Sequence, residues 1–489
     1  MPKKPKSLRD LANPERKLTH TIDGRGEGSQ SSFEMINPST AAPFAHCPDA
    51  STEQLDRAVA AARAAFSEWS RRSFAERRRF LHKFAARVRD YADELATVIT
   101  REQGKPLSNS AREVAGTAHS LEAMSNIKIK DQVLRNDGKN RITLQYRPLG
   151  VIGAITPWNV PVGLASHKIA QGLLAGNTMV LKPSPYTPLA TLLLGELSRD
   201  ILPPGVFNVL AGGNEVGQRL SEHPGIDKIS FTGSVATGKR VMASASGTLK
   251  RVTLELGGND PAILLDDADF DAMTPKIFGA AFANCGQVCM AIKRLYVPAD
   301  RYDQVCDSLT NLAKNYRVGD GFEADVQMGP LQNKMQYDKV LDVLEDTKRL
   351  PGVRILAGGH TLNQPGYFLA PTIVADISDD ARLVTEEQFG PILPVLKYTD
   401  VDDAVSRAND TRMGLCASVW TKDIEKGAAI AARLEAGTVW VNHHLGSEPD
   451  VPFGGFKESG LGREHGVMGV QSYMEPQVIN VPVAAPATT

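Results

Sequence analysis

The chain has 489 residues, 42% apolar and 23% charged, which is ordinary for a globular protein but too much for a single hydrophobic core. Its 55 basic residues nearly cancel its 56 acidic residues, which argues against nucleic acid or an anionic membrane as the main partner, and no apolar run is long enough to span a bilayer. Five scattered cysteines argue against a disulfide scaffold and favour a reducing compartment, so we expect a cytoplasmic protein.

The chain opens with a polar, Gly/Ser-rich lead-in that we expect to be poorly ordered. Its basic start is followed by no apolar stretch, so we expect a solvated tail and no secretory signal; residues 483–489 read as a loose end. Two amphipathic helices are predicted next, over about 55–69 and 80–98, because their apolar residues recur every three or four positions. Ser51 and Ser73 each precede a Gln or Glu by three residues, the spacing of a capping box.

From about residue 149, short apolar runs alternate with helical segments, the pattern of βαβ units and a parallel sheet. The predicted strands cover 151–155, 178–181, 206–210, 228–231 and 252–256, and the predicted helices 162–175, 189–198, 215–221 and 236–244. A second α/β stretch runs from about 261 to 440, with strands at 295–297, 392–396 and 416–420 and helices at 404–409 and 425–434. The polar segment 131–147 is predicted to be an edge strand that leaves the main body, and such strands invite pairing with a second subunit.

Two reactive side chains stand among glycines and short residues. Cys289 closes the run Gly286-Gln287-Val288-Cys289, and Glu255 opens Glu255-Leu256-Gly257-Gly258. A thiolate can attack a carbonyl, and a carboxylate can then activate water against the resulting thioester. We therefore predict covalent catalysis, with the thiol partly exposed near groups that favour its anion.

Gly233 and Ser234 lie where a predicted strand meets a predicted helix, so the backbone can approach a ligand and the helix start can offer N–H groups to phosphate. The segment matches a P-loop as far as Lys239, but Arg240 stands where a hydroxyl must hold magnesium, which argues against a nucleotide triphosphatase. The dinucleotide pattern G-x-G-x-x-G is absent, so a plain strand-to-helix turn stays open.

Two further polar residues follow predicted strands. Lys182, at a carboxyl strand end, can reach a ribose or phosphate, although a surface lysine before a proline-fixed turn is the simpler interpretation. Asn159 can donate to an oxyanion beside the N–H of Cys289, although a lone asparagine there is more often a turn residue.

We expect no metal site. Cys285 and Cys289 have a spacing that zinc pairs tolerate, but no second cysteine pair or spaced histidine pair completes the ligand set. His443 and His444 are adjacent and would point in different directions on a strand. Four cysteines are predicted to be buried structural thiols: Cys47, Cys285, Cys306 and Cys416.

Seven segments, in this order along the chain, together resemble the aldehyde dehydrogenase superfamily over about residues 35–480. They are Pro157–Asn159, Lys182–Ser184, Phe231–Ser234, Glu255–Gly258, Gly286–Cys289, Glu387–Pro391 and Pro452–Gly460. The resemblance implies an α/β fold with a Rossmann-type cofactor domain, an α/β catalytic domain and a β bridging arm. It places the NAD(P)-binding domain at 1–126 and 148–257, the catalytic domain at 258–446, the oligomerisation arm at 127–147 and 468–489, and a return segment to the cofactor domain at 447–467.

By motif position, the resemblance implies that Cys289 is the nucleophile, Glu255 the general base, and Asn159 part of the oxyanion hole. The implied cofactor contacts are Trp158, Lys182, Ser184, Gly233, Ser234, Glu387 and Phe389. The implied substrate pocket contains Val160, His167, Val288, Met290, Ser447 and Phe453. Glu475 falls where some members carry a second, proton-relaying glutamate.

The implied reaction is oxidation of an aldehyde to the acid with NAD. NADP stays open, because Pro185 replaces a glutamate that binds the adenosine ribose in many NAD-preferring members. Val160, His167 and Ser447 stand where aromatic residues are common, so we expect a roomier, less apolar mouth and a bulky aliphatic or aromatic aldehyde.

Glu255 favours hydrolysis, because members that pass the acyl group to coenzyme A commonly lack this glutamate. Two alternatives remain open: a CoA-acylating semialdehyde dehydrogenase, and a non-catalytic NAD-binding or structural protein of the same fold. The resemblance also implies that the arm pairs subunits into a homodimer or homotetramer.

Overall fold

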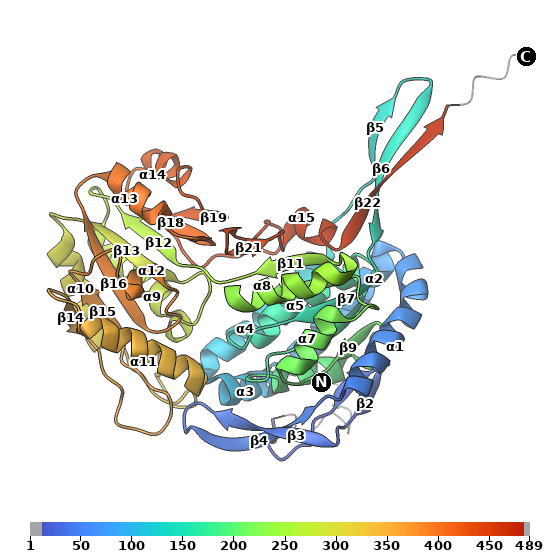
Figure 1. The fold of residues 1–489 in the computed structure, drawn as a ribbon, viewed down its shortest axis with the longest axis horizontal. Helices are drawn as coiled ribbons and strands as arrows, with labels where there is room; N and C mark the ends of the chain where they lie inside the picture. The colour runs from blue at the N-terminus through green and yellow to red at the C-terminus, as the bar shows by residue number, and fades with distance from the viewer. Residues whose placement is uncertain (1–11, 484–489) are drawn as a thin grey trace, which may run out of the picture.

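Two large sheets, each covered by helices, form the body of the molecule, and a third, narrow sheet projects from it (Figure 1). The computed structural model describes residues 12–483. The predicted solvated tail at the basic start, residues 1–6, and residues 484–489 of the predicted loose end lie outside the described residues.

The N-terminal lead-in is more ordered than we expected. Strands β1 (His20–Ile22) and β2 (Arg25–Glu27) pair in an antiparallel hairpin, and β1 also pairs with β9 at the edge of the first sheet. Asp23 and Gly24 at the turn have φ values of 51° and 69°, as an Asp-Gly hairpin turn requires. Strands β3 (Ser31–Asn37) and β4 (Ala42–Asp49) form a second antiparallel pair.

Four helices follow: α1 (Thr52–Arg71), α2 (Phe74–Asp90), α3 (Ala92–Gln103) and α4 (Leu107–Ser125). Both predicted capping boxes are present, at Ser51 and at Ser73. The single helix predicted over 80–98 is wrong, because Tyr91 leaves helical geometry at φ −117° and ψ 25° and separates α2 from α3.

The first sheet has eight strands in the order β2-β1-β9-β8-β7-β10-β11-β21. Its parallel strands are β7 (Val151–Ile155), β8 (Thr178–Lys182), β9 (Phe207–Val209), β10 (Lys228–Thr232) and β11 (Arg251–Glu255). The helices between them are α5 (Pro161–Leu174), α6 (Leu189–Ser198), α7 (Asn214–Glu222) and α8 (Val235–Ala245). These confirm the predicted βαβ units, with no boundary shifted by more than one residue.

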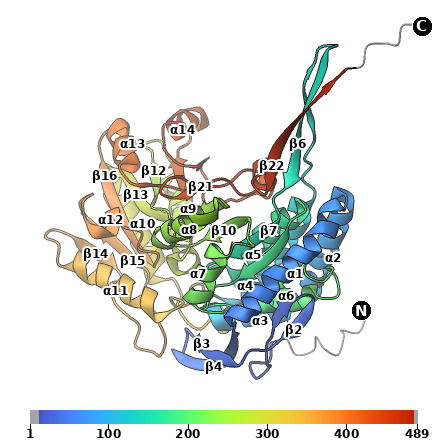
Figure 2. The ribbon, with the colours of Figure 1, turned by 45° about the vertical axis from the view of Figure 1, so that its right-hand side comes forward.

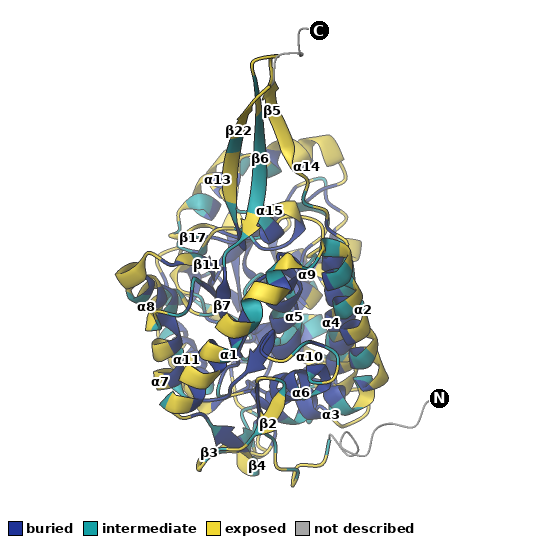
Figure 3. Ribbon diagram, turned by 90° about the vertical axis from the view of Figure 1, so that its right-hand side faces the viewer, coloured by how far each residue is buried: buried dark blue, intermediate teal, exposed yellow. Residues whose placement is uncertain are grey.

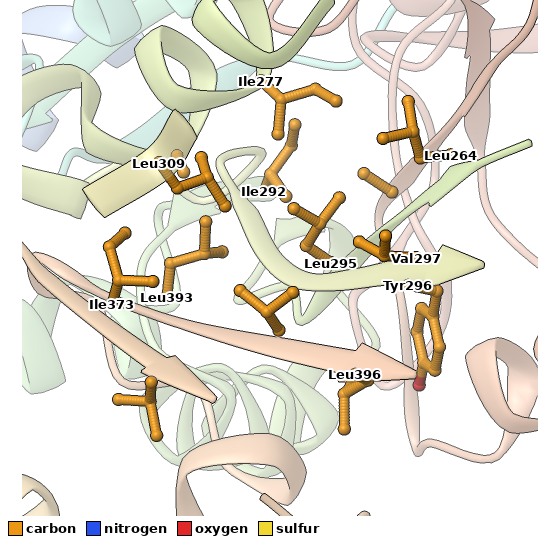
Figure 4. Close-up of a cluster of buried hydrophobic side chains, with 14 of the residues drawn as sticks. Leu264, Ile277, Ile292, Leu295, Tyr296, Val297, Leu309, Ile373, Leu393 and Leu396 are labelled. Carbon is orange, nitrogen blue, oxygen red and sulfur yellow. The ribbon is translucent and has the colours of Figure 1, made fainter. Parts of the chain in front are cut away.

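The second sheet has seven strands in the order β14-β15-β16-β13-β12-β18-β19. They are β12 (Asp260–Leu264), β13 (Ile292–Pro298), β14 (Arg354–Ala357), β15 (Thr372–Ala375), β16 (Ile392–Tyr398), β18 (Cys416–Trp420) and β19 (Thr438–Val441). The associated helices are α9 (Phe270–Phe282), α10 (Tyr302–Lys314), α11 (Lys334–Lys348), α12 (Arg382–Thr385), α13 (Val401–Asn409) and α14 (Ile424–Ala431). Aliphatic side chains from β12, β13, β15 and β16 meet those of α9 and α10 in a closely packed core (Figure 4).

The projecting arm is a three-stranded sheet in the order β22-β6-β5, formed by β5 (Gln132–Asn136), β6 (Asn140–Pro148) and β22 (Met474–Pro482). It extends away from both large sheets (Figure 2), and much of it is exposed (Figure 3). The prediction of an edge strand at 131–147 is wrong in detail, because β6 lies in the middle and pairs with β5 and β22 along its length.

The C-terminal stretch before the arm returns to the first sheet. Strand β21 (Gly460–Leu461) pairs with β11, and β20 (Phe456–Lys457) pairs with β17 (Met413–Gly414) beside the second sheet. Helix α15 (Gly466–Gln471) then leads into β22. Over residues 12–483, no helix is both long enough and apolar enough to cross a membrane.

Candidate active site

Three predicted site residues, Lys182, Glu255 and Ser234, gather where the parallel strands of the first sheet end. Ile155 of β7 lies beside Lys182 of β8, and Thr232 of β10 lies beside Glu255 of β11. Ser234 begins α8 just beyond Thr232. The carboxyl edge of an open parallel sheet is where such folds bind ligands, so the register brings these motifs to one place.

The chain before Cys289 folds in an unusual conformation. Asn284, Cys285 and Gly286 have φ values of 50°, 62° and 70°, three consecutive residues in the left-handed region. A Cβ at Gly286 would overlap the carbonyl oxygen of Gly390, so only glycine fits there. The nucleophile loop, which we define as residues 284–290, therefore rests directly on the Glu387–Pro391 motif.

Cys289 is half-buried, whereas the other four cysteines are buried, as predicted. The buried ammonium of Lys293 donates to the carbonyl oxygens of Val288, at 2.9 Å, and Cys289, at 2.6 Å. Burial raises the pKa of the Cys289 thiol to about 12; the charge of Lys293 lowers it, and the carboxylates of Glu387, Asp260 and Glu255 raise it further. Lys293 was not predicted as a site residue, although a lysine within an apolar strand is a recognisable signal.

Asn159 is buried, and its side chain is held next to the nucleophile loop. Its Nδ2 donates to the carbonyl oxygen of Gln287 at 2.9 Å. Its own carbonyl oxygen accepts from Lys105 Nζ at 2.8 Å and from Asn284 Nδ2 at 3.0 Å. Because an amide nitrogen carries two hydrogens, one remains for an oxygen that develops charge near Cys289.

Glu255 is 5% exposed, and neither of its carboxylate oxygens has a hydrogen-bond partner among the described residues. Burial, followed by the negative charge of Glu464, raises its pKa well above the ordinary value. A Cβ added at Gly454 would stand 2.9 Å from Glu255 Oε1, so that glycine keeps space beside the carboxylate. Burying a carboxyl group without a hydrogen-bond partner destabilises the fold. Such a group therefore indicates a function, and proton transfer is the usual one.

A buried ion pair next to Glu255 was missed by sequence reasoning. Lys168 Nζ lies 2.6 Å from Glu464 Oε1, and both side chains are almost wholly buried. Burial is the largest single influence on the Glu464 carboxyl and raises its pKa, but the charge and hydrogen bond of Lys168 together with the two neighbouring histidines lower the pKa overall. Glu475, predicted as a relay residue, instead lies on β22 and pairs with the exposed Arg251 at 2.6 Å. The assignment to Glu475 is corrected: Glu464 is the second glutamate near Glu255.

The chain matches the aldehyde dehydrogenase family model over residues 26–479. It belongs to the aldehyde dehydrogenase family. It is 40% identical over 460 residues to aldehyde dehydrogenase LUC3 of a Fusarium species, covering 94% of this chain and 97% of that one. It is also 37% identical over 489 residues to retinaldehyde dehydrogenase 3 of Mus musculus, covering 98% and 95%. The structure of an aldehyde dehydrogenase of Bacillus cereus in complex with NAD+ superposes with a TM-score of 0.95 at 35% identity, covering 99% of both chains. This chain is thus an oxidoreductase that oxidises aldehydes to acids with NAD.

The residues of this aldehyde dehydrogenase that were predicted to hold NAD fall into two groups. Trp158 and Phe389 meet edge to face with ring centroids 5.3 Å apart, and Glu387 Oε1 accepts from the N–H of Gly258 at 3.2 Å. A Cβ at position 257 would overlap the Glu387 carboxylate, so Gly257 leaves the space that this carboxylate occupies. This first group lies next to the nucleophile loop.

The second group lines the carboxyl edge of the first sheet. Lys182 is buried at the end of β8, where burial lowers its pKa to about 8, and Ser184 is buried just after it. Ser234 caps the exposed start of α8, accepting from Thr237 N at 3.3 Å, and Gly233 precedes it. A helix start with free N–H groups, a lysine at a strand end and an aromatic pair near the thiol fit the phosphates and rings of a dinucleotide.

The predicted substrate-pocket residues of the aldehyde dehydrogenase are only partly brought together. His167, Ser447 and Phe453 all contact His465, which was not predicted. Val288 and Met290 flank Cys289, and the Met290 carbonyl oxygen lies 2.8 Å from His444 Nε2. Val160 precedes α5, about two turns before His167.

Proposed function

We propose that this enzyme oxidises its aldehyde through a thioester on Cys289, which water activated by Glu255 then hydrolyses. The observation that carries the proposal is the carboxylate of Glu255, buried and without a hydrogen-bond partner among residues 12–483. Its raised pKa suits a general base that must work near neutral pH. An enzyme that passed its acyl group to coenzyme A would not need such a base.

In the first half of the reaction, the sulfur of Cys289 adds to the aldehyde carbon. The oxygen that gains charge is held by the free N–H of the Asn159 amide and the backbone N–H of Cys289. When bound, NAD+ accepts the hydride that leaves this carbon. Lys293 holds the carbonyls of Val288 and Cys289, which orients the backbone of the nucleophile loop.

In the second half, Glu255 takes a proton from water as the water oxygen attacks the thioester, and the acid leaves as the sulfur of Cys289 is released. The Lys168–Glu464 pair lies close enough to Glu255 for the charges of both residues to act on its carboxyl group. Because the charge of Glu464 disfavours a second negative charge, it also makes Glu255 a stronger base.

For the substrate, we propose a bulky aliphatic or aromatic aldehyde. Val160, His167 and Ser447 leave the predicted pocket less crowded than large aromatic side chains would, and Val288, Met290 and Phe453 offer apolar contact. One relative is named for retinaldehyde, a bulky aldehyde, which supports the same class here.

Pro185 neither binds ribose hydroxyls nor repels a 2′-phosphate, so we propose that NADP is also used, less well than NAD.

For the assembly, we propose a cofactor domain at 1–126 and 148–257, a catalytic domain at 258–446, an arm at 127–147 and 468–489, and a return segment at 447–467. The two large sheets and the three-stranded arm support this division. We also propose a homodimer or homotetramer that the arm holds together, in a cytoplasmic protein.

The proposal is tested with a panel of aldehydes, NAD or NADP, with and without coenzyme A, for wild type and Cys289→Ala. We expect wild type to form free acid without coenzyme A, and Cys289→Ala to lose oxidation while it still binds NAD by fluorescence titration. Strict dependence on coenzyme A, or full turnover by Cys289→Ala, would refute the mechanism.

A further inference from the structure

His167, His465 and Glu464 lie together although the two histidines are 298 positions apart in sequence. Nδ1 of His167 and Nε2 of His465 are 3.1 Å apart, and the rings meet edge to face. One ligand atom from each of the three side chains lies within 4.8 Å of the other two. His465 and Glu464 are buried, and His167 is half-buried.

The two imidazole nitrogens are spaced almost as a tetrahedral zinc ion would hold them. Zinc–nitrogen bonds of about 2.0–2.1 Å at tetrahedral angles place two ligand nitrogens about 3.3 Å apart. The present hydrogen bond leaves one proton between the two atoms, and that proton can move to the other nitrogen of the same ring. Both facing lone pairs then become free without any net release of a proton.

Both rings are enclosed by the protein, since His465 is buried and His167 is half-buried. Each ring can offer the nitrogen that faces the other ring as a ligand when that nitrogen carries no proton. His465 is held by its own backbone, at φ 62° and with its N–H donating to Gln171 Oε1 at 3.1 Å, so little ordering remains for the ion to impose.

Glu464 completes a three-ligand set of the type that leaves a fourth position open. Lys168 and Ser230 both contact its Oε1, so Oε2 can turn to a cation. The buried Lys168 ammonium opposes a second positive charge at this place, so we expect a reversible site and not a structural one. Ser447 Oγ, 3.2 Å from His465 Nδ1, holds the far side of the His465 ring.

We propose that His167, His465 and Glu464 form a reversible zinc site that inhibits the enzyme. An ion bound there through Oε2 would share the charge of Glu464 with Lys168 and add positive charge beside Glu255, which weakens Glu255 as a base. It would also stand among residues of the predicted substrate pocket, His167, Ser447 and Phe453. The inhibition rests on the proposed function, whereas the binding of the ion does not.

The binding is tested by calorimetry with zinc chloride on full-length Cys289→Ala protein, which removes the nucleophilic thiol as a competing zinc ligand. We expect one zinc per subunit, and a loss of affinity on the order of tenfold or more when His167→Asn or His465→Gln is added. These substitutions keep a polar atom near the original nitrogen, and thermal melting checks that they fold. His223→Gln is the matched control, because it breaks a surface His223–Asp56 pair and should leave zinc binding unchanged.

The inhibition is tested by steady-state oxidation with increasing zinc. We expect wild type to be inhibited and to recover with a chelator, and His465→Gln to need at least about tenfold more zinc. Equal zinc affinity with and without the histidine pair would overturn the site. Binding that depends on the pair, with no change in turnover, would overturn the inhibition and keep the site. If the enzyme failed to oxidise aldehydes, the calorimetric result would still decide the binding.

Discussion

Lys293 places a buried positive charge against the backbone of Cys289, and the effect of this charge on the reactivity of the thiol can be tested. The Nζ atom of Lys293 donates hydrogen bonds to the carbonyl oxygens of Val288 and Cys289, and it lies 3.6 Å from Glu387 Oε1. We expect Lys293→Met to slow alkylation of Cys289 by iodoacetamide by about tenfold, because one unit in thiol pKa changes the thiolate fraction tenfold.

Lys293→Arg is the matched control, because it keeps the charge. Cys47, Cys285, Cys306 and Cys416 are buried, so alkylation reports on Cys289. Equal alkylation rates in wild type and Lys293→Met would mean that the lysine has no electrostatic effect on the thiol.

The pH dependence of thioester hydrolysis should report Glu255. A base acts only when it is deprotonated, and burial together with Glu464 raises the pKa of this carboxyl above the ordinary value of 4.5. The rate of hydrolysis should therefore fall as the pH drops through the raised pKa of Glu255. This fall should occur at a higher pH than the one at which an exposed carboxyl group titrates. The measurement is the breakdown rate of the acyl enzyme between about pH 5 and pH 9.

Glu464→Gln should move this acidic limb to lower pH, because it removes a negative neighbour and leaves the positive charge of Lys168. An unchanged limb in Glu464→Gln would show that Glu464 does not act on Glu255.

Among the elements, the nucleophile loop depends most on a single glycine. Gly286 has a φ of 70°, and a Cβ there would overlap the Gly390 carbonyl oxygen, so Gly286→Ala must displace the loop. We expect kcat/KM to fall about a hundredfold, because a shift of about 1 Å in a reacting group can cost that much.

Gly279→Ala provides the comparison. Gly279 lies inside α9 with open space around its Cα, so alanine there should leave activity unchanged and raise the melting temperature slightly. Full activity in Gly286→Ala would show that the left-handed turn is not what positions Cys289.

The arm carries exposed apolar side chains on its outer strand, Val478 at 59% and Val481 at 52% exposure. If subunits pair through it, Val478→Lys with Val481→Lys should yield a smaller species in light scattering after gel filtration, because charges on an edge strand block pairing. Ile424→Lys, which puts the same charge on exposed α14, should keep the assembly. An unchanged mass in the arm variant would place the subunit interface elsewhere.

At the scale of the whole molecule, the sequence predicted the features that depend on neighbouring residues: the strands, the helices and the turns between them. Apolar runs and capping residues marked the parallel strands and their helices, and the glycines around Glu255 and Cys289 marked sharp turns at strand ends. The order of the N-terminal lead-in was not predicted. Strand β1 is held by its pairing with β9, which lies far along the chain, and local composition does not reveal that pairing.

Residues that long-range packing places were harder to predict. Lys168 and Glu464 are 296 positions apart, and neither stands in a short motif that sequence reasoning used. Glu475 was chosen instead because it lies near the expected place in the chain, but strand β22 carries it out onto the arm. His465 was missed for the same reason as Glu464, since only the return of the chain to the first sheet brings it to His167.

The central claim is that an acyl group passes through Cys289 and waits there for water activated by Glu255. Mass spectrometry of Glu255→Gln, quenched after mixing with aldehyde and NAD, tests it most directly. We predict an added mass equal to the acyl group, located by peptide mapping on Cys289, absent without NAD and absent when Cys289→Ala is combined with it. Acid formed by Glu255→Gln at the wild-type rate with no adduct, or an adduct on another residue, would contradict the account.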